Sequence, residues 1–216
     1  MNLEGIIFDQ DGVLIDSEPI HFLAIRDYMQ DLGYEYTMEI NNQFFGHNAK
    51  SLYTSLKNIF ACSLSVEELT HGAKAFMPKH EHKITPMPGL SPLLEKISQQ
   101  KVIMGLATGT HRTLTESNLK KHKVRKYFSN IVCGDEVTNG KPDPEIYLLV
   151  ANNLGINPKN CLVIEDSPAG LKSAKTAGMT TIALVSGHNK SADLTLADHK
   201  INHLSEVNEI LKLVSY

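Results

Sequence analysis

Five short apolar runs, separated by segments long enough for helices, constrain the fold of this chain more than any other feature of its sequence. The runs are rich in β-branched residues and too short for buried helices, so each predicts a strand. They are 5–8 (GIIF), 101–107 (KVIMGLA), 130–133 (NIVC), 161–164 (CLVI) and 180–185 (TTIALV). Strands that are apolar throughout and alternate with helices are typical of a parallel sheet covered on both faces. The sequence therefore predicts an α/β fold with a doubly wound, Rossmann-like parallel sheet.

Helix signals lie between these runs. Apolar residues at helical spacing predict helices over 90–97 and 146–154. Asp143-Pro144 and Ser167-Pro168 each place a capping side chain before a proline at the first helical position. Gly178 is well placed to end the second of these capped helices. These signals for helix starts and ends therefore support the alternation of strands and helices.

The segment 18–81 departs from this alternation. It contains three helical stripes and no apolar strand run. Ser65 and Glu68, at the start of the third stripe, have the spacing of a capping box. The stripes cover 20–32, 52–60 and 66–77. We therefore predict that 18–81 is an all-helical cap domain, inserted into a catalytic α/β core made of 1–17 and 82–216.

Composition excludes several classes of protein. The 216 residues carry 21 Lys plus Arg against 24 Asp plus Glu, a net charge of −3, which lacks the positive field that nucleic acids attract. No apolar run reaches about 18 residues and the amino terminus does not resemble a signal peptide, so neither a membrane partner nor secretion is expected. Cys62, Cys133 and Cys161 have no Cys-x-x-Cys spacing, which favours a reducing cytoplasm. We expect a monomer, with a dimer left open.

Charged and polar residues follow four of the predicted strands, at the edge where open parallel sheets bind their ligands. These are Asp9 and Asp11 after the first run, Thr108 and Gly109 after the second, Lys141 in the loop beyond the third, and Glu165 and Asp166 after the fourth. Each of them alone could be an ordinary turn or a helix cap. Two acidic pairs at one edge exceed what capping requires, so the set as a whole predicts a functional site.

The chemistry of this set favours phosphoryl transfer. Crowded carboxylates repel one another unless a divalent cation lies among them, and oxygen ligands of this kind suit Mg²⁺. Asp9 and Asp11, two apart on an extended chain, point to the same side, so one could bind metal and attack while the other transfers protons. The Thr108 hydroxyl and the amides after it could hold phosphate oxygens, and Lys141 could neutralise a transferring phosphoryl group. An aspartyl-phosphate intermediate would follow from this arrangement.

Four segments resemble, in order and spacing, the four motifs of the haloacid dehalogenase-like superfamily. They are 8–18 (FDQDGVLIDSE), 107–109 (ATG), 141–144 (KPDP) and 164–167 (IEDS). The inserted helices resemble the branch that contains β-phosphoglucomutases and sugar-phosphate or phosphoglycolate phosphatases. The resemblance spans the whole predicted core.

The resemblance implies a role for each site residue. Asp9 would be the nucleophile and Asp11 the general acid and base, while Thr108, Gly109 and Lys141 would hold the phosphate. Mg²⁺ would be bound by Asp9, by the carbonyl of Asp11, and by Asp166 with Glu165. Metal-binding carboxylates argue against dehalogenation itself, which the related enzymes perform without a metal.

Two further positions bear on the choice between a mutase and a phosphatase. His21 matches a substrate-binding histidine of the mutases, although phosphatases of this branch often have it too. The mutases also have an arginine shortly after a glycine resembling Gly46, where this chain reads 46–50 (GHNAK) with Lys50 instead. An ammonium does not reproduce the bidentate phosphate binding of a guanidinium.

We therefore predict a Mg²⁺-dependent phosphomonoester hydrolase that acts on a small phosphorylated metabolite, such as a sugar phosphate. A β-phosphoglucomutase-type phosphomutase is the alternative. A non-catalytic phosphate-binding protein is a third reading, disfavoured because binding alone needs no acid and base.

Overall fold

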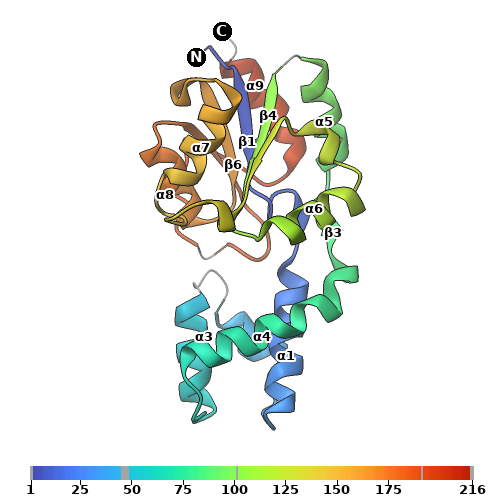
Figure 1. The fold of residues 1–216 in the computed structure, drawn as a ribbon, viewed down its shortest axis with the longest axis vertical. Helices are drawn as coiled ribbons and strands as arrows, with labels where there is room; N and C mark the ends of the chain where they lie inside the picture. The colour runs from blue at the N-terminus through green and yellow to red at the C-terminus, as the bar shows by residue number, and fades with distance from the viewer. Residues whose placement is uncertain (1, 45–48, 101, 191, 215–216) are drawn as a thin grey trace. The chain divides into compact units, whose positions relative to one another are not determined.

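The computed structural model describes residues 2–44, 49–100, 102–190 and 192–214. They form two compact units (Figure 1). The α/β unit consists of Met1–Asp16, Thr85–Gly187 and Asp193–Tyr216. The helical unit consists of Ser17–Ile84 together with His188–Ala192, so a short segment from the carboxyl-terminal half of the chain belongs with the helices.

The described part of the α/β unit contains a six-stranded sheet with the order β5-β4-β1-β6-β7-β8. The strands are β1 (Gly5–Phe8), β4 (Ile103–Ala107), β5 (Asn130–Val132), β6 (Cys161–Glu165), β7 (Thr180–Leu184) and β8 (His199–Ile201). Every neighbouring pair is parallel, which confirms the predicted sheet. Phe8 at the end of β1 pairs with Leu106 on one side and Ile164 on the other. The central strands therefore end level with one another.

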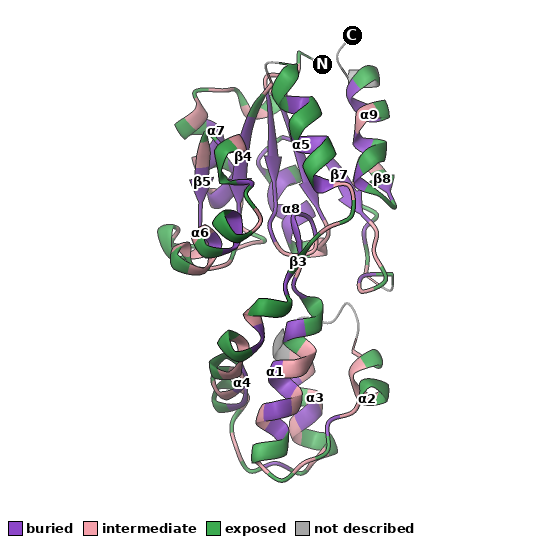
Figure 2. Cartoon of the chain, turned by 90° about the vertical axis from the view of Figure 1, so that its right-hand side faces the viewer, coloured by how far each residue is buried: buried purple, intermediate pink, exposed green. Residues whose placement is uncertain are grey.

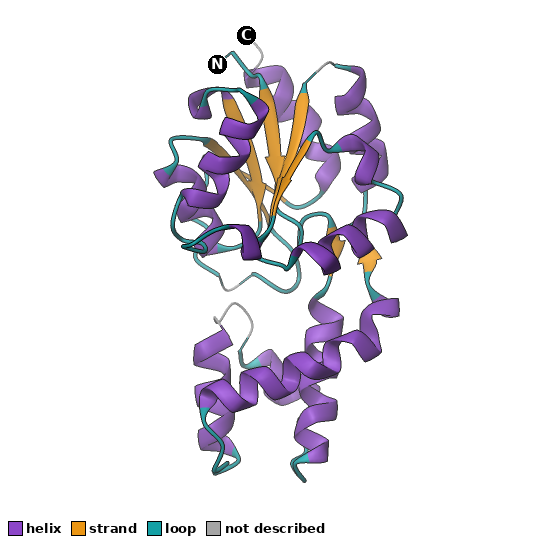
Figure 3. Cartoon of the chain, viewed as in Figure 1, coloured by secondary structure: helices purple, strands orange, loops and turns teal. Residues whose placement is uncertain are grey.

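Helices lie on both faces of this sheet (Figure 3). They are α5 (Leu90–Gln99), α6 (Arg112–Lys121), α7 (Glu145–Leu154), α8 (Pro168–Thr176) and α9 (Val207–Val214). Tyr147 and Val150 of α7 and Ala174 of α8 are fully buried against Ile7 of β1 and Val163 of β6. The predicted proline-capped start of α8 is confirmed, because the Ser167 side chain accepts a hydrogen bond from the Gly170 amide.

Helix α7 begins one residue later than the sequence predicts. Pro144 takes the capping position rather than the first helical position, and Asp143 accepts a hydrogen bond from the Glu145 amide at 2.9 Å. The aspartate therefore still binds an amide at the helix start, although the backbone turns into the helix one residue further on.

Short elements complete the α/β unit. β2 (Ile15–Asp16) and β3 (Thr85–Pro86) pair as an antiparallel ribbon at the two points where the chain leaves and re-enters the unit. Single 3₁₀ turns, labelled η2 to η5, lie at 125–127, 134–136, 158–160 and 204–206. The strands of the large sheet are mostly buried, whereas the helices over them show one buried and one exposed side (Figure 2).

The helical unit contains α1 (Glu18–Asp31), α2 (Met38–Asn42), α3 (Ala49–Ile59), α4 (Val66–His80) and the 3₁₀ turn η1 (Glu81–Lys83). The predicted capping box at Ser65 and Glu68 is present, with both reciprocal hydrogen bonds. Gly33 follows α1 with a φ of +83°, a left-handed conformation that glycine adopts without strain. The five-residue helix α2 is an addition to the three predicted stripes, because it is too short to show a helical repeat.

A cluster of charges joins α1 to the end of α4. The Asp27 carboxylate accepts hydrogen bonds from Lys79 Nζ at 2.8 Å and Arg26 Nη2 at 2.7 Å, and it lies 2.9 Å from His80 Nε2. The hydrogen bond from Lys79, reinforced by Arg26 and His80, holds the pKa of Asp27 well below its usual range despite burial. Asp27 and His80 are both buried, so this cluster ties the two helices together inside the helical unit.

No helix among the described residues is both long and apolar enough to cross a membrane.

Candidate active site

The carboxyl ends of β1 and β6 bring three carboxylates together. Asp9 directly follows β1, Glu165 ends β6 and Asp166 directly follows it. One oxygen from each lies within 4.8 Å of the others. The hydrogen bonding between β1 and β6 continues one residue beyond β1, because the Asp9 amide donates to the Ile164 carbonyl at 2.9 Å. The backbone of the sheet therefore positions Asp9 directly.

Lys141 is the counter-ion of this cluster. Its Nζ donates to Asp9 Oδ1 at 2.6 Å, to Glu165 Oε1 at 2.7 Å and to the Ala107 carbonyl at 3.2 Å. Only 12% of its side chain is exposed. Burial opposes the charge of the ammonium, but the two carboxylates hold the pKa of Lys141 well above its usual range. Lys141 is therefore a fixed positive charge beside Asp9.

Glu165 is held by hydrogen bonds on both of its oxygens. In addition to Lys141, Oε1 accepts from the Tyr147 hydroxyl at 2.9 Å. Oε2 accepts from the Asp166 amide and from the amide and hydroxyl of Ser167, each at 2.9 Å. Burial opposes its ionisation, but Lys141 and Ser167 hold the pKa of Glu165 below its usual value. This arrangement favours a role in positioning Lys141, and the predicted role of Glu165 as a metal ligand stays a prediction.

A glycine in α8 makes room for this carboxylate. A Cβ atom placed on Gly170 would lie 1.7 Å from Glu165 Oε1, which is far inside van der Waals contact. Similarly, a Cβ atom on Gly12 would lie 2.0 Å from Asp166 Oδ2, and Gly12 has a φ of +74°. Both acidic side chains of the fourth motif therefore lie against backbone that has no side chain.

The other two carboxyl groups of the cluster, Asp9 and Asp166, are in surroundings that disfavour their ionised form. Burial raises the pKa of Asp9 to about 7, with Glu165 and Asp11 adding to the rise and Lys141 opposing it. Burial, and then the charges of Glu165 and Asp9, raise the pKa of Asp166 well above its usual range. One lysine thus does not neutralise the cluster. A hard divalent cation fits this set of oxygen donors, because it would favour the ionised form of both carboxyl groups.

Asp11 lies at the start of the turn that leads to β2. Its Oδ2 accepts a hydrogen bond from Thr110 Oγ1 at 2.7 Å, and Gln10 Nε2 lies 3.4 Å away. An isolated bridge pairs Asp11 with Ile15. The contact between Asp11 and Thr110 joins the loop after β1 to the loop after β4.

Thr108 and Gly109 occupy the loop after β4, as the sequence predicts. The Thr108 side chain is buried, and its Oγ1 accepts a hydrogen bond from the Thr110 amide at 3.0 Å. A Cβ atom on Gly134 would lie 2.2 Å from the Gly109 carbonyl oxygen, so the loops after β4 and β5 approach closely. The predicted phosphate-binding role of Thr108 and Gly109 stays a prediction.

Two of the predicted positions lie outside the α/β unit or outside the described residues. His21 is an exposed residue of α1 in the helical unit, and its substrate-binding role stays a prediction. Residues 46–48, which bear on the choice between mutase and phosphatase, lie outside the described residues.

Sequence reasoning missed Tyr147, and it placed Thr110 at the strand end beside Thr108 and Gly109 without assigning it a role. Tyr147 belongs to the apolar stripe that predicts the helix over 146–154, a pattern that gives no sign that its hydroxyl binds Glu165. Thr110 follows the second motif by one residue, and its polar side chain close to a strand end was the available signal.

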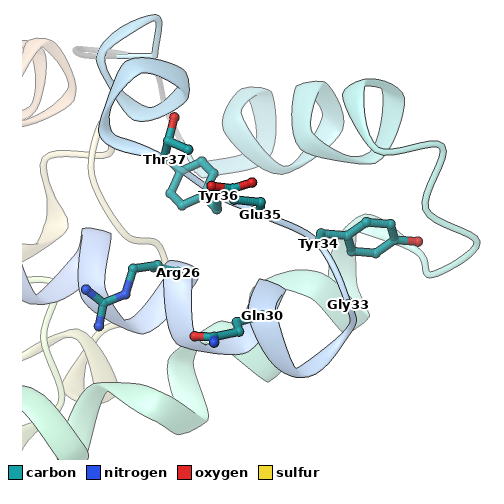
Figure 4. Close-up of a pocket in the computed structure, with 7 residues that line it drawn as sticks. All are labelled: Arg26, Gln30, Gly33, Tyr34, Glu35, Tyr36 and Thr37. Carbon is teal, nitrogen blue, oxygen red and sulfur yellow. The ribbon is translucent and has the colours of Figure 1, made fainter.

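A hollow in the helical unit has a volume of about 520 Å³ and is lined by none of these residues. Arg26 and Gln30 of α1 border it on one side, and the segment 33–37 borders it on the other (Figure 4). The Arg26 guanidinium is bound to Asp27. The candidate active site is therefore the cluster at the sheet edge rather than this hollow.

A parallel sheet with a lysine-bound acidic cluster at its carboxyl edge defines an enzyme of the α/β class that acts on an anionic group. The family model described as haloacid dehalogenase-like hydrolase matches residues 6–184. The chain belongs to this family.

Two curated relatives and one solved structure illustrate the similarity. A phosphorylated carbohydrates phosphatase of Thermotoga maritima is 34% identical over 187 residues, which cover 83% of this chain and 84% of that protein. A validoxylamine A 7′-phosphate phosphatase of Streptomyces hygroscopicus subsp. limoneus is 32% identical over 203 residues, covering 93% and 94%. The solved β-phosphoglucomutase of Clostridium difficile has a TM-score of 0.75 and 25% identity, covering 97% of this chain and 96% of that one.

Proposed function

We propose that this protein is a Mg²⁺-dependent phosphatase that hydrolyses a small phosphorylated metabolite, with a sugar phosphate as the favoured class. The observation that carries the proposal is the buried Lys141 ammonium, 2.6 Å from a carboxylate oxygen of Asp9. A nucleophilic carboxylate beside a fixed positive charge is suited to attack on a phosphorus atom whose oxygens that charge neutralises. The two phosphatases named above support the reaction class.

The proposed mechanism has two displacements at phosphorus. Asp9 attacks the phosphorus atom and the bond to the leaving oxygen breaks, while Asp11 donates a proton to that oxygen. Water then attacks the aspartyl phosphate, Asp11 takes its proton, and phosphate leaves with Asp9 restored. Lys141 and the loop carrying Thr108 and Gly109 hold the phosphate oxygens in both steps.

Asp9, the main-chain carbonyl of Asp11, and Asp166 with Glu165 would hold Mg²⁺. When bound, the ion supplies positive charge that stabilises the charge developing on the phosphate oxygens. The hydrogen bond from the Thr110 hydroxyl holds one carboxylate oxygen of Asp11 in place. Glu165, bound by Tyr147 and Ser167, orients Lys141.

A phosphomutase is the second candidate, favoured by the similarity to β-phosphoglucomutase along nearly the whole chain. In a mutase the group that attacks the aspartyl phosphate is a hydroxyl of a sugar rather than water. The absence of an arginine from 46–50 continues to favour hydrolysis, because a bisphosphate intermediate needs a second strong anion site.

The three cysteines support a location in the cytoplasm. Cys62, Cys133 and Cys161 are all buried free thiols, which fits a reducing compartment. We propose a cytoplasmic enzyme that acts on a small metabolite and has no nucleic-acid partner, as a monomer with a dimer left open.

The test is hydrolysis of p-nitrophenyl phosphate, followed as released nitrophenolate with and without Mg²⁺. We expect turnover that EDTA abolishes and that the variant Asp9→Asn lacks, with a melting curve showing that the variant is folded. Unchanged turnover by this variant would remove Asp9 as the nucleophile. Conversion of β-glucose 1-phosphate to glucose 6-phosphate with little phosphate release would favour the mutase.

A further inference from the structure

Lys141 lies in a loop rather than in a helix or strand, although it is the cation of the candidate active site. The loop runs from the 3₁₀ turn η3 to the start of α7. Residues 138–140, directly before Lys141, are all exposed. An exposed segment without regular structure has few packing contacts, so its conformation depends on hydrogen bonds. The backbone position of Lys141 is therefore set by the groups that bind this segment.

The carboxylate of Glu145, the first residue of α7, binds two successive amides of this segment. Its Oε1 accepts from the Thr138 amide and its Oε2 from the Asn139 amide, each at 2.8 Å. Oε2 also accepts from Asn139 Nδ2 at 3.3 Å. The two backbone hydrogen bonds, that from Thr138 first, hold the pKa of Glu145 below its usual value, so the acceptor is charged at neutral pH. Hydrogen bonds to a charged acceptor are about twice as strong as neutral ones, so Glu145 restrains this segment firmly.

The backbone on the other side of Lys141 is held through Asp143. The Asp143 amide donates to the Gly140 carbonyl at 3.1 Å, and the Asp143 carbonyl accepts from the Ser173 hydroxyl at 2.6 Å. Ser173 is a buried residue of α8. The chain after Lys141 is therefore anchored to α8.

Glu145 is the side-chain anchor of the segment before Lys141. Within the described part of the chain, it is the only side chain that hydrogen-bonds the backbone of 138–140. In the proposed mechanism the Lys141 ammonium, 2.6 Å from Asp9 Oδ1, also binds the phosphate oxygens. A displacement of about 1 Å in a group that acts on the transition state can lower the rate about 100-fold. The conformation of this loop therefore matters to the reaction, although Glu145 is not a member of the acidic cluster.

We propose that Glu145 is a positioning residue for the reaction, which holds the backbone before Lys141 so that the ammonium keeps its place beside Asp9 and the phosphate in both displacements. The inference rests on the proposed phosphatase function and concerns residues of the α/β unit alone. The charge that Lys141 neutralises on the phosphoryl oxygens matters most in the transition state. Loosening the loop should therefore lower kcat more than it raises KM.

The test is steady-state hydrolysis of p-nitrophenyl phosphate in Mg²⁺ by Glu145→Ala. We expect kcat to fall about tenfold while KM changes by less than about twofold. Glu145→Gln keeps one accepting oxygen but places an NH₂ group against an amide, so its kcat should fall about threefold. The matched control is Glu206→Ala, because Glu206 Oε1 accepts from the amides of Asn202 and His203 at 3.0 and 2.8 Å. These residues follow β8, which carries no residue of the candidate site, so kcat of the control should stay within about twofold of wild type.

A double-mutant cycle with Lys141→Met separates positioning from simple stabilisation of α7. If Glu145 acts through Lys141, adding Glu145→Ala should leave the residual kcat of Lys141→Met unchanged. A structural role that does not involve Lys141 would lower kcat by the same factor in both backgrounds. Melting curves establish that each variant is folded, and if Glu145→Ala is not, the cycle is made with Glu145→Gln.

Each outcome decides a separate point. A decrease in kcat that disappears in the Lys141→Met background supports the proposal. Equal decreases in the two backgrounds, an equal decrease in Glu206→Ala, or wild-type kcat in both Glu145 variants would overturn it and leave the phosphatase function standing. Absence of turnover by the wild type would instead remove the proposed function.

Discussion

The position of Lys141 between two buried carboxylates leads to a quantitative prediction for Lys141→Met. The substitution keeps most of the side-chain volume and removes the charge that balances Asp9 and Glu165, both buried. Removing one partner of a buried ion pair costs about 3–5 kcal/mol, because a charge is left without compensation. For a domain of 150–250 residues each kcal/mol lowers the melting temperature by about 2–4 °C. We therefore expect a decrease of about 6–20 °C in EDTA.

The decrease in melting temperature of Lys141→Met should depend on pH, and the pKa of Asp9 gives the direction. Without Lys141 the pKa of Asp9, already raised by burial to about 7, rises further above its unfolded value of about 4. The folded variant then binds a proton that the unfolded chain does not. Its stability is therefore greater at low pH and is lost as pH rises through the folded pKa. We therefore expect the difference in melting temperature between wild type and variant to be larger at pH 8 than at pH 6.

The measurement is thermal unfolding by circular dichroism in EDTA, with p-nitrophenyl phosphate turnover measured in Mg²⁺. Loss of the positive charge should lower kcat by about 100-fold or more. The control is Lys175→Met, since Lys175 forms an ion pair with Asp198 at 2.7 Å in the same unit, but 37% of its side chain is exposed. Such a pair contributes about 0–1 kcal/mol. Equal decreases in melting temperature for the two variants would refute the counter-ion argument.

Three further predictions test other parts of the structure. Gly170→Ala should abolish turnover and destabilise the α/β unit, because the new Cβ displaces Glu165. The control is Gly140→Ala, where a new Cβ meets no other atom, and its melting temperature should stay within about 1–2 °C of wild type. Asp27→Asn should lower the free energy of unfolding, measured in urea at pH 6. Because the pKa of Asp27 is depressed in the folded state, the difference in this free energy between wild type and variant should decrease as pH falls below about 4. A difference that does not change with pH would contradict this reasoning. Mg²⁺ at 100 times its dissociation constant should stabilise the wild type by about 2.7 kcal/mol. Asp166→Asn should lose that stabilisation, and retention of it would place the ion elsewhere.

The strands were predictable to the extent that they are apolar. β1 coincides with its predicted range, and β6 extends it by one residue, because continuous burial on both faces selects an unbroken apolar run. β8, at the edge of the sheet, was missed because Ile201 is its only apolar and only fully buried residue, so no apolar run marks it. Short elements whose side chains are polar leave no periodic signal.

The candidate site could be predicted as a set of strand-end residues, but its internal contacts could not. The rule that parallel strands end at one edge is enough to place Asp9 near Asp166. It does not reveal that the Thr110 hydroxyl reaches Asp11, a contact between residues 99 positions apart. Nor does it distinguish a tyrosine whose hydroxyl binds a carboxylate, Tyr147, from one that only fills space. Those details depend on side-chain packing.

The assignment of His188–Ala192 to the helical unit has a consequence for chimaeras in which that unit is replaced by the one of a related enzyme. The chain passes between the units four times, after Asp16, Ile84, Gly187 and Ala192, so the helical unit is not a single insertion. A chimaera that replaces only Ser17–Ile84 would leave the original segment His188–Ala192 against helices from another protein. Exchange of the whole helical unit between relatives therefore requires two coordinated replacements rather than one.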